Sequence, residues 1–124
     1  MINILIAEDD PVSAAVLEKI IRLEPGTKVT VVSDGEGAMR LLDDPSRSFD
    51  ILFLDLEMPQ LNGFDVLERI SGSQMLKSLQ IVLCTASNDR NTVERAAALG
   101  IRHYLVKPGT KESVTAKLRQ LRVV

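Results

Sequence analysis

The sequence contains a single cysteine and a single histidine, and this scarcity limits the chemistry available to the chain. With Cys84 as the only cysteine among 124 residues, neither a disulfide framework nor a cysteine-based metal site can form within one chain. The position of Cys84 inside an apolar run indicates a buried hydrophobic side chain rather than a reactive thiol. Nothing around His103 marks it as a metal ligand or a base, so we expect a surface or packing role for it.

Long apolar runs and a strong excess of charge are also missing. No run approaches the roughly 18 residues of a membrane span. The acidic residues Glu8, Asp9 and Asp10 interrupt the first apolar stretch, so no N-terminal signal is visible. Because the net charge is only −2, no general attraction to nucleic acid or to an anionic membrane is expected. We therefore expect a cytoplasmic protein that binds neither directly.

The overall composition is that of a globular domain. Hydrophobic residues make up 45% of the chain and charged residues 26%, both ordinary for a folded soluble protein. A length of 124 residues suits one domain with a real core. Since no repeat, low-complexity tract or linker is visible, we expect one domain over residues 1–124, either a complete small protein or part of a longer one.

Short apolar runs alternate with longer amphipathic segments, a pattern typical of repeated strand–helix units. The five expected strands are Asn3–Ala7, Lys28–Val32, Ile51–Leu54, Ile81–Cys84 and Tyr104–Val106. The third is apolar throughout and should be covered on both faces. Because crossovers between parallel strands are right-handed, the expected fold class is α/β, a single doubly wound (βα)5 sheet with helices on both faces.

The helices are expected from their caps and apolar periodicity. Asp10 can cap the first helix, with Pro11 at the first helical position, and Thr110 can cap the last. Gly100 should end the fourth helix, which spans about Asn91 to Leu99. The expected apolar positions are Val12, Val16, Ile20 and Leu23 in the first helix, Ala38, Leu41 and Leu42 in the second, Phe64, Leu67 and Ile70 in the third, and Val114, Leu118 and Leu121 in the fifth. Basic residues of the last helix indicate a solvated face.

Four of the apolar runs end on polar residues suited to phosphate chemistry. These endings are Glu8-Asp9-Asp10, Asp55, Thr85 and Lys107. In a doubly wound sheet, ligands bind beyond the carboxyl ends of the strands, so these side chains should meet at one edge. Clustered carboxylates repel one another, and a hard cation such as Mg²⁺ relieves the repulsion.

Each residue at this edge can be given a role. Asp55, on an interior strand, is the expected nucleophile, since aspartate accepts phosphoryl groups. Lys107 and the hydroxyl of Thr85 can contact the transferred group, because phosphoryl transfer depends mainly on positioning and charge neutralisation. Taken singly, each residue has an ordinary structural explanation, and helix capping is the better explanation for Asp10. Their conjunction at four strand ends carries the hypothesis.

These segments resemble the receiver domain of two-component response regulators, and the resemblance covers the whole chain. The first strand and its acids read ILIAEDDP, and the acceptor segment reads DILFLDLEMPQLNG, close to the family pattern D-x-x-M-P-x-x-x-G. The fourth strand ends in CTAS and the fifth in YLVKP. The resemblance implies the flavodoxin-like fold of the chemotaxis receiver, with five parallel strands in the order 2-1-3-4-5.

The resemblance also implies roles for individual residues. Asp55 would be the phosphoacceptor, and Mg²⁺ would be held by Glu8, Asp9, Asp55 and the backbone carbonyl of Glu57. Lys107 and Thr85 would contact the phosphoryl group, while Thr85 and Tyr104 would form the switch. The bond before Pro108 would be cis. Phosphorylation would then reshape the face formed by the fourth helix, the fifth strand and the fifth helix.

The partners implied by the resemblance are a sensor histidine kinase or a histidine phosphotransfer protein, together with an output partner or domain that the sequence does not identify. Arg102 and His103 stand where many DNA-binding relatives carry acidic residues of a charged dimer interface, so that dimer is not expected and a phosphorylation-dependent dimer would be weak. Gly109 replaces a frequent phenylalanine, which indicates a looser loop.

Two other functions are compatible with parts of the pattern. A phosphohydrolase of the haloacid type would carry a D-x-D-x-T/V pattern after its first strand, which this sequence lacks. A scaffold that is not phosphorylated would usually lack the acceptor, an acid or the lysine, all of which are present. We therefore expect a signalling module that is not a turnover enzyme.

Overall fold

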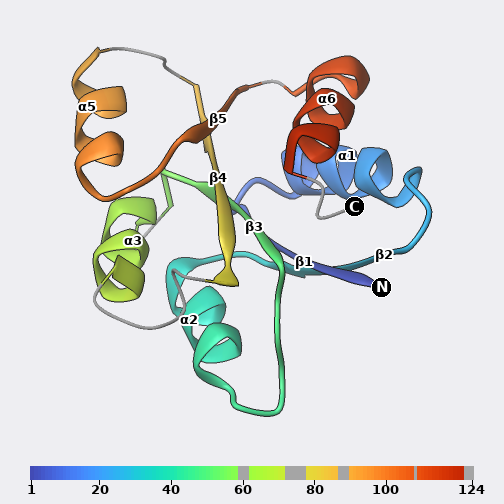
Figure 1. The fold of residues 1–124 in the computed structure, drawn as a ribbon, viewed down its shortest axis with the longest axis horizontal. Helices are drawn as coiled ribbons and strands as arrows, with labels where there is room; N and C mark the ends of the chain where they lie inside the picture. The colour runs from blue at the N-terminus through green and yellow to red at the C-terminus, as the bar shows by residue number, and fades with distance from the viewer. Residues whose placement is uncertain (59–61, 72–77, 87–89, 108, 122–124) are drawn as a thin grey trace.

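The computed structural model describes residues 1–58, 62–71, 78–86, 90–107 and 109–121. Its elements, in chain order, are β1 (Ile2–Ala7), α1 (Pro11–Arg22), β2 (Thr27–Val32), α2 (Gly35–Asp43), β3 (Ile51–Asp55), α3 (Gly63–Ser71), β4 (Gln80–Thr85), α5 (Arg90–Ala98), β5 (His103–Val106) and α6 (Lys111–Leu121). The five strands form one parallel sheet in the order β2-β1-β3-β4-β5 (Figure 1). The expected α/β fold and strand order are confirmed.

Helices cover both faces of the sheet and divide the core into two layers. Helices α1 and α6 lie on one face, and α2, α3 and α5 lie on the other (Figure 1). Side chains that alternate along a strand point to opposite layers: in β3, Phe53 packs on the α1–α6 side and Leu54 on the other. All five residues of β3 are buried, as the continuous apolar run predicts.

The apolar stripe predicted for the first helix is largely wrong. Val12 is 70% exposed and Val16 48% exposed, while Leu23 lies beyond the helix as its C-cap. The buried residues of α1 are Ala14 and Ile21. Leu17 and Ile20 pack partly against the core, so only Ile20 of the expected set faces inward. Several valines and isoleucines are spaced at helical intervals here, and the pattern alone does not show which set meets the sheet.

The predicted helix ends are confirmed. Asp10 is the N-cap of α1, and its carboxylate accepts hydrogen bonds from the backbone N–H groups of Val12 and Ser13. The hydroxyl of Thr110 accepts a bond from the Ser113 N–H at 3.0 Å at the start of α6. Gly100, with φ of 89°, follows α5 in the left-handed region that favours glycine.

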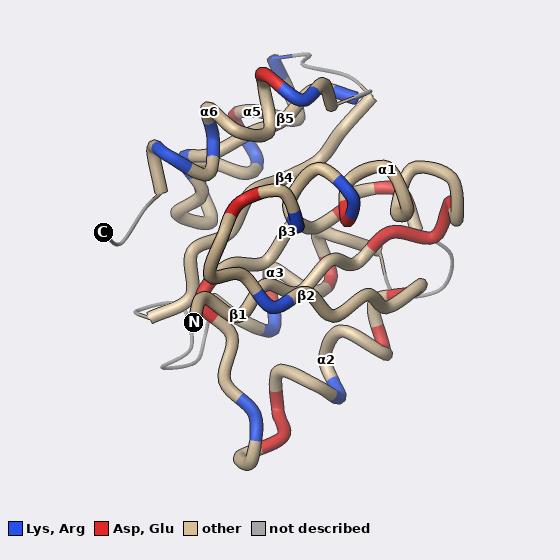
Figure 2. The backbone as a smooth tube through the Cα atoms, turned by 90° about the vertical axis from the view of Figure 1, so that its right-hand side faces the viewer, with Lys and Arg blue, Asp and Glu red and all other residues tan. Residues whose placement is uncertain are grey.

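The remaining apolar positions also pack inward. Ala38, Leu67 and Ile70 are buried, whereas Leu41, Leu42 and Phe64 pack partly against the same layer. In α6, Val114, Leu118 and Leu121 are buried. Its basic residues Lys111 and Arg119 are exposed, and blue segments mark lysine and arginine along this helix in Figure 2. Among the described residues, no helix combines the length and apolar character that crossing a bilayer requires.

Candidate functional site

Three acidic side chains meet where β1 and β3 end. The two strands are parallel neighbours, with Ala7 opposite Leu54, so Glu8 and Asp55 follow at the same level of the sheet. Carboxylate oxygens of Glu8, Asp9 and Asp55 all lie within 4.8 Å of one another. Asp9 is exposed, whereas Glu8 is 5% and Asp55 3% exposed. The predicted acidic cluster is therefore present, with two of its three members removed from water.

Gly63, the last residue of the D-x-x-M-P-x-x-x-G pattern, packs directly against the backbone of the acceptor segment. A Cβ atom at this position would lie 2.6 Å from the carbonyl oxygen of Asp55 and 2.7 Å from Cα of Leu56, so only glycine fits without a backbone shift. Its N–H donates to the Leu56 carbonyl at 3.2 Å. Gly63 begins α3 and holds that helix against the segment carrying Asp55.

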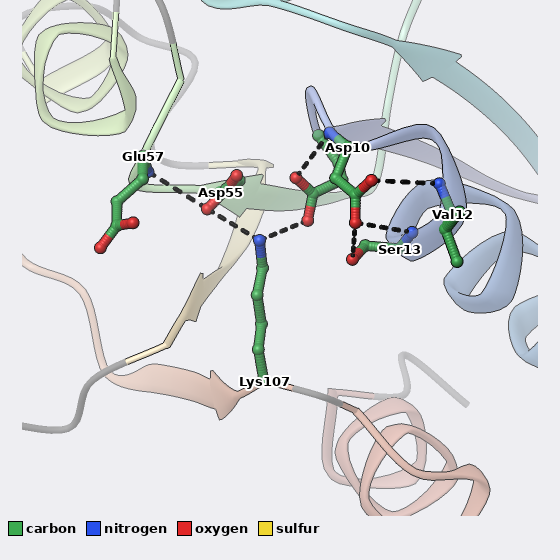
Figure 3. Close-up of polar contacts among 7 residues, drawn as sticks. Asp10, Val12, Ser13, Asp55, Glu57 and Lys107 are labelled. Atoms are coloured by element: carbon green, nitrogen blue, oxygen red, sulfur yellow. Dashed lines mark hydrogen bonds and ion pairs between the residues drawn. The ribbon is translucent and has the colours of Figure 1, made fainter.

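Lys107 reaches across from the edge strand to the acids at the centre. Its ammonium nitrogen lies 2.5 Å from Oε1 of Glu8 and 3.1 Å from Oδ1 of Asp55 (Figure 3). The backbone N–H of Lys107 donates to the carbonyl of Thr85 at 2.8 Å, which ties the end of β5 to β4. One cation therefore contacts both buried carboxylates.

Burial and mutual repulsion make the two buried carboxyls titrate differently. Burial raises the pKa of the Asp55 carboxyl to about 7, and the neighbouring Glu8 carboxyl adds to the rise. Burial alone would raise the pKa of Glu8 as well, but its interactions with Asp55 and Lys107 outweigh that effect and leave this pKa below the usual value. Of the two buried carboxyls, Asp55 is therefore the one that takes up a proton first as the pH falls.

The lysine responds to the same environment. Burial would lower the pKa of Lys107, but its contacts with Glu8 and Asp55 raise it above the usual value. The ammonium is therefore charged throughout the physiological range. The Lys107 ammonium is thus held between the carboxyl groups of Glu8 and Asp55, where it could also pair with an incoming phosphoryl oxygen.

The acidic cluster fits the requirements of Mg²⁺. Ligand oxygens on opposite sides of an octahedral Mg²⁺ ion lie about 4.2 Å apart, twice the Mg–O distance of about 2.1 Å. The carboxylate oxygens lie within 4.8 Å of one another, so a small closing movement or a bridging water would bring them into one coordination shell. Hard carboxylate oxygens are the ligands that this ion prefers.

Thr85 is buried at the end of β4. Cys84 is the register partner of Asp55, so Thr85 follows one position beyond the acceptor on the adjacent strand. Its side chain is 4% exposed. This placement agrees with the expectation that its hydroxyl belongs to the same edge of the sheet.

Tyr104 and Glu57 lie around the cluster. The hydroxyl of Tyr104 donates to the carbonyl of Ile101 at 3.0 Å, with the carbonyl of Val93 at 3.4 Å, and its ring packs partly against the α2–α3–α5 layer. The N–H of Glu57 donates to Oδ1 of Asp55 at 3.1 Å. The role of its carbonyl as a metal ligand stays a prediction. The predicted cis bond before Pro108 lies outside the described residues.

Sequence reasoning missed a cavity that adjoins the site. Val12 and Val16 line it from α1 and Leu105 from β5, with Glu8 and Lys107 at the same wall. This position accounts for the exposure of the two valines, which were expected in the core. The one indication of the cavity in the sequence is that the two valines lie close to the polar end of β1. Apolar periodicity alone does not distinguish a cavity wall from a core face.

Comparison with known proteins places this site in a family. The family described as "Response regulator receiver domain" matches residues 4–119. The chain is 29% identical to the chemotaxis protein CheY of Pseudomonas aeruginosa over 119 residues, covering 96% of the chain and 94% of that protein. It is 32% identical to the transcriptional regulatory protein CpxR of Escherichia coli K12 over 98% of the chain, but spans only 49% of that protein.

Solved structures agree on the fold. The chemotaxis response regulator CheY4 of Vibrio cholerae superimposes with a TM-score of 0.88 at 21% identity, over 98% of the chain and 99% of that structure. The bacteriophytochrome response regulator RtBRR gives a TM-score of 0.85 at 28% identity, over the whole chain and 80% of that structure. The acidic cluster, the lysine that bridges it and these similarities lead to one conclusion: the chain belongs to the response regulator receiver domains of two-component signalling.

Proposed function

We propose that the protein accepts a phosphoryl group on Asp55 from a phosphohistidine of a sensor histidine kinase or a histidine phosphotransfer protein. The observation that carries this proposal is the contact of one ammonium, that of Lys107, with both buried carboxylates of the cluster. Two buried acids with a partly buried lysine at strand ends are costly in structural terms, because desolvated charges seldom add stability. The arrangement is better explained by a negative charge that arrives during the reaction.

The transfer follows from the groups at the site. Asp55 reacts as the carboxylate, after its proton has passed to solvent. One of its oxygens forms a bond to phosphorus while the bond from phosphorus to the donor imidazole nitrogen breaks; that nitrogen keeps the electron pair and takes up a proton from solvent, so the imidazole leaves as the neutral ring. Lys107 pairs with a phosphoryl oxygen, and the hydroxyl of Thr85 donates a hydrogen bond to another. Mg²⁺, held by Glu8, Asp9, Asp55 and the Glu57 carbonyl, would neutralise charge on the transferred group.

The phosphorylated site would act on an output surface through Thr85 and Tyr104. The Thr85 hydroxyl would move toward the phosphoryl group, and the Tyr104 ring would turn further inward as space opens beside β4. This shifts an existing equilibrium and reshapes the face formed by α5, β5 and α6, which would bind an output partner or domain. We propose a cytoplasmic module, with at most a weak phosphorylation-dependent dimer, that does not turn over external substrates.

The test is phosphorylation by a small donor. Incubation with acetyl phosphate and Mg²⁺ should add the mass of one phosphoryl group, and Asp55→Asn should abolish this addition because the amide is not a nucleophile. Asp43→Asn, which makes the same change at an exposed position of α2, is the matched control and should be phosphorylated normally. Failure of the unmodified protein to gain mass would refute the proposal.

A further inference from the structure

Helix α5 is held to the molecule by very little apolar packing. Ala96 is the only buried residue among its nine, whereas α3 buries Gly63, Val66, Leu67 and Ile70. A helix that buries one alanine fully and Val93 only partly gains little from burial, since stabilisation scales with the apolar area removed from water. Other contacts must therefore determine where α5 lies.

One of these contacts is made by Arg95. Its guanidinium carbon lies 4.0 Å from the centre of the Phe64 ring, well inside the range of a cation–π interaction. Its Nη2 lies 3.6 Å from Oε1 of Glu68. Both partners belong to α3, which lies beside α5 on the same face of the sheet (Figure 1). Arg95 thus joins two helices that share little apolar contact.

Phe64, the partner of Arg95 in α3, is held close to the proposed phosphoacceptor Asp55. Phe64 directly follows Gly63, which packs on the Asp55 carbonyl too closely to admit a Cβ atom. The same turn is closed by a reciprocal pair of hydrogen bonds, from the Asn62 N–H to the Asp65 carboxylate and from the Asp65 N–H to the Asn62 side chain, both 3.1 Å. Phe64 therefore has a fixed position relative to Asp55.

We propose that Arg95 is a positioning residue that tethers α5 to the acceptor segment in the unphosphorylated protein. The consequence for signalling rests on the proposed function. When phosphorylation moves α5, the contact between Arg95 and Phe64 is lost. The tether then stabilises the unphosphorylated arrangement, and its removal favours the phosphorylated one by linkage. The route passes through α3 and is separate from Thr85 and Tyr104.

The first experiment needs no phosphorylation. Hydrogen exchange of the α5 amides should be about two- to five-fold faster in Arg95→Ala than in the unchanged protein, the factor expected from an exposed cation–π contact. Arg90→Ala is the matched control: Arg90 pairs with Glu94 at 2.9 Å within the same helix and contacts no other element through this pair. Equal exchange in the two variants would overturn the tether.

The second experiment tests the consequence for the site. Arg95→Ala should bind the phosphoryl mimic beryllofluoride, with Mg²⁺, about two- to five-fold more tightly, and Arg90→Ala should bind it as the unchanged protein does. Arg95→Lys should be intermediate, because a lysine retains the charge over the ring. Faster exchange in Arg95→Ala without tighter beryllofluoride binding would show that Arg95 holds α5 in place but does not favour the unphosphorylated state. That outcome would overturn the link to phosphorylation.

The two partners can be tested together. Phe64→Leu keeps an apolar side chain but removes the ring, and it should reproduce the faster α5 exchange of Arg95→Ala. In the double variant the two effects should not add, since both remove the same contact. Additive effects would show that the residues act separately. If the unchanged protein fails to bind beryllofluoride, the proposed function fails, while the exchange measurements still decide whether Arg95 tethers α5.

Discussion

All five residues of β3 are buried, whereas at the edge of the sheet only Leu105 of the four residues in β5 is buried. The helices that flank β5 differ in the same way, because α6 buries three residues and α5 buries one. The acids of the site follow the central strands β1 and β3, and the lysine and the tyrosine belong to the edge. The acids, which need a fixed geometry, therefore follow the well-packed centre. Of the two groups proposed to move, Tyr104 lies where packing is thin, whereas Thr85 is buried at the end of β4.

Lys107 connects the two regions. It leaves the edge strand and contacts Glu8 and Asp55 at the centre. A change in charge at the central acids therefore acts directly on Lys107 at the end of β5, without a rearrangement of the core. This contact links the well-packed centre of the sheet to its thinly packed edge at the site itself. The four predictions that follow test the difference between centre and edge.

The largest difference should appear in the free energy of unfolding after side-chain truncation. Phe53 is 1% exposed at the centre. Its replacement by alanine should lower the free energy of unfolding by about 3–5 kcal/mol, because a cavity remains in the core. Val106→Ala at the edge, where the valine is 46% exposed, should cost no more than about 0.5 kcal/mol. Urea unfolding measures both, and similar costs would remove the contrast.

The pH dependence of stability should reveal the central acids. Because the pKa of Asp55 is raised to about 7 in the fold from its ordinary 3.8, the native state holds a proton that the unfolded chain has released. The metal-free protein should therefore lose stability, on the order of 3 kcal/mol, as pH rises from about 4 to 7.

Urea unfolding at pH 5 and pH 8 would measure this loss, and Asp55→Asn should largely abolish it. Glu8 acts in the opposite direction, since its pKa is lowered, and its contribution is lost only as the pH falls below its ordinary value of 4.5. A stability that increases between pH 5 and 8 in the unchanged protein would contradict the prediction.

Removing the charge that crosses from edge to centre should strengthen metal binding. Lys107→Met keeps an unbranched side chain of nearly the same length but takes a positive charge away from the acidic cluster, so Mg²⁺ affinity should increase on the order of tenfold. Isothermal titration measures the affinity. Lys111→Met, on the exposed side of α6, is the control and should leave it unchanged. Weaker binding in Lys107→Met would show that the lysine orders the acids rather than competing with the ion.

The smallest effect is expected at the edge itself. Tyr104→Phe removes the hydrogen bond to the carbonyl of Ile101, at 3.0 Å, and should cost about 0.5–1.5 kcal/mol. Because the bond joins β5 to the segment after α5, hydrogen exchange should quicken in α5 and remain unchanged in β3. Equal changes in both elements would mean that centre and edge unfold together.

Much of the fold could be predicted from local patterns. Each strand is a short apolar run, and the caps at Asp10 and Thr110 and the stop at Gly100 depend on the chemistry of one or two residues. The stripe of α1 could not be predicted in the same way. Val12 and Val16 are as apolar as Leu17 and Ile21, and only the docking of the helix on the sheet decides which side faces the core.

The candidate site shows the same division. The clustering of Glu8, Asp9 and Asp55 could be expected because parallel strands end at one edge. The motif spacing did not reveal that Gly63 packs against the Asp55 carbonyl too closely to admit a Cβ atom. Nor could the sequence show that Arg95 lies over Phe64, since these residues are far apart along the chain and meet only when α3 and α5 pack on one face.

The sequence by itself determined the strand–helix alternation, the polar residues at four strand ends and the resemblance to receiver domains, because periodicity, capping and motif spacing are properties of neighbouring residues. Tertiary structure alone decided the contact of Lys107 with two buried carboxylates, the raised pKa of Asp55 and the weak attachment of α5. Those features depend on burial and on distances between separate elements, which arise only when the sheet and its helices assemble.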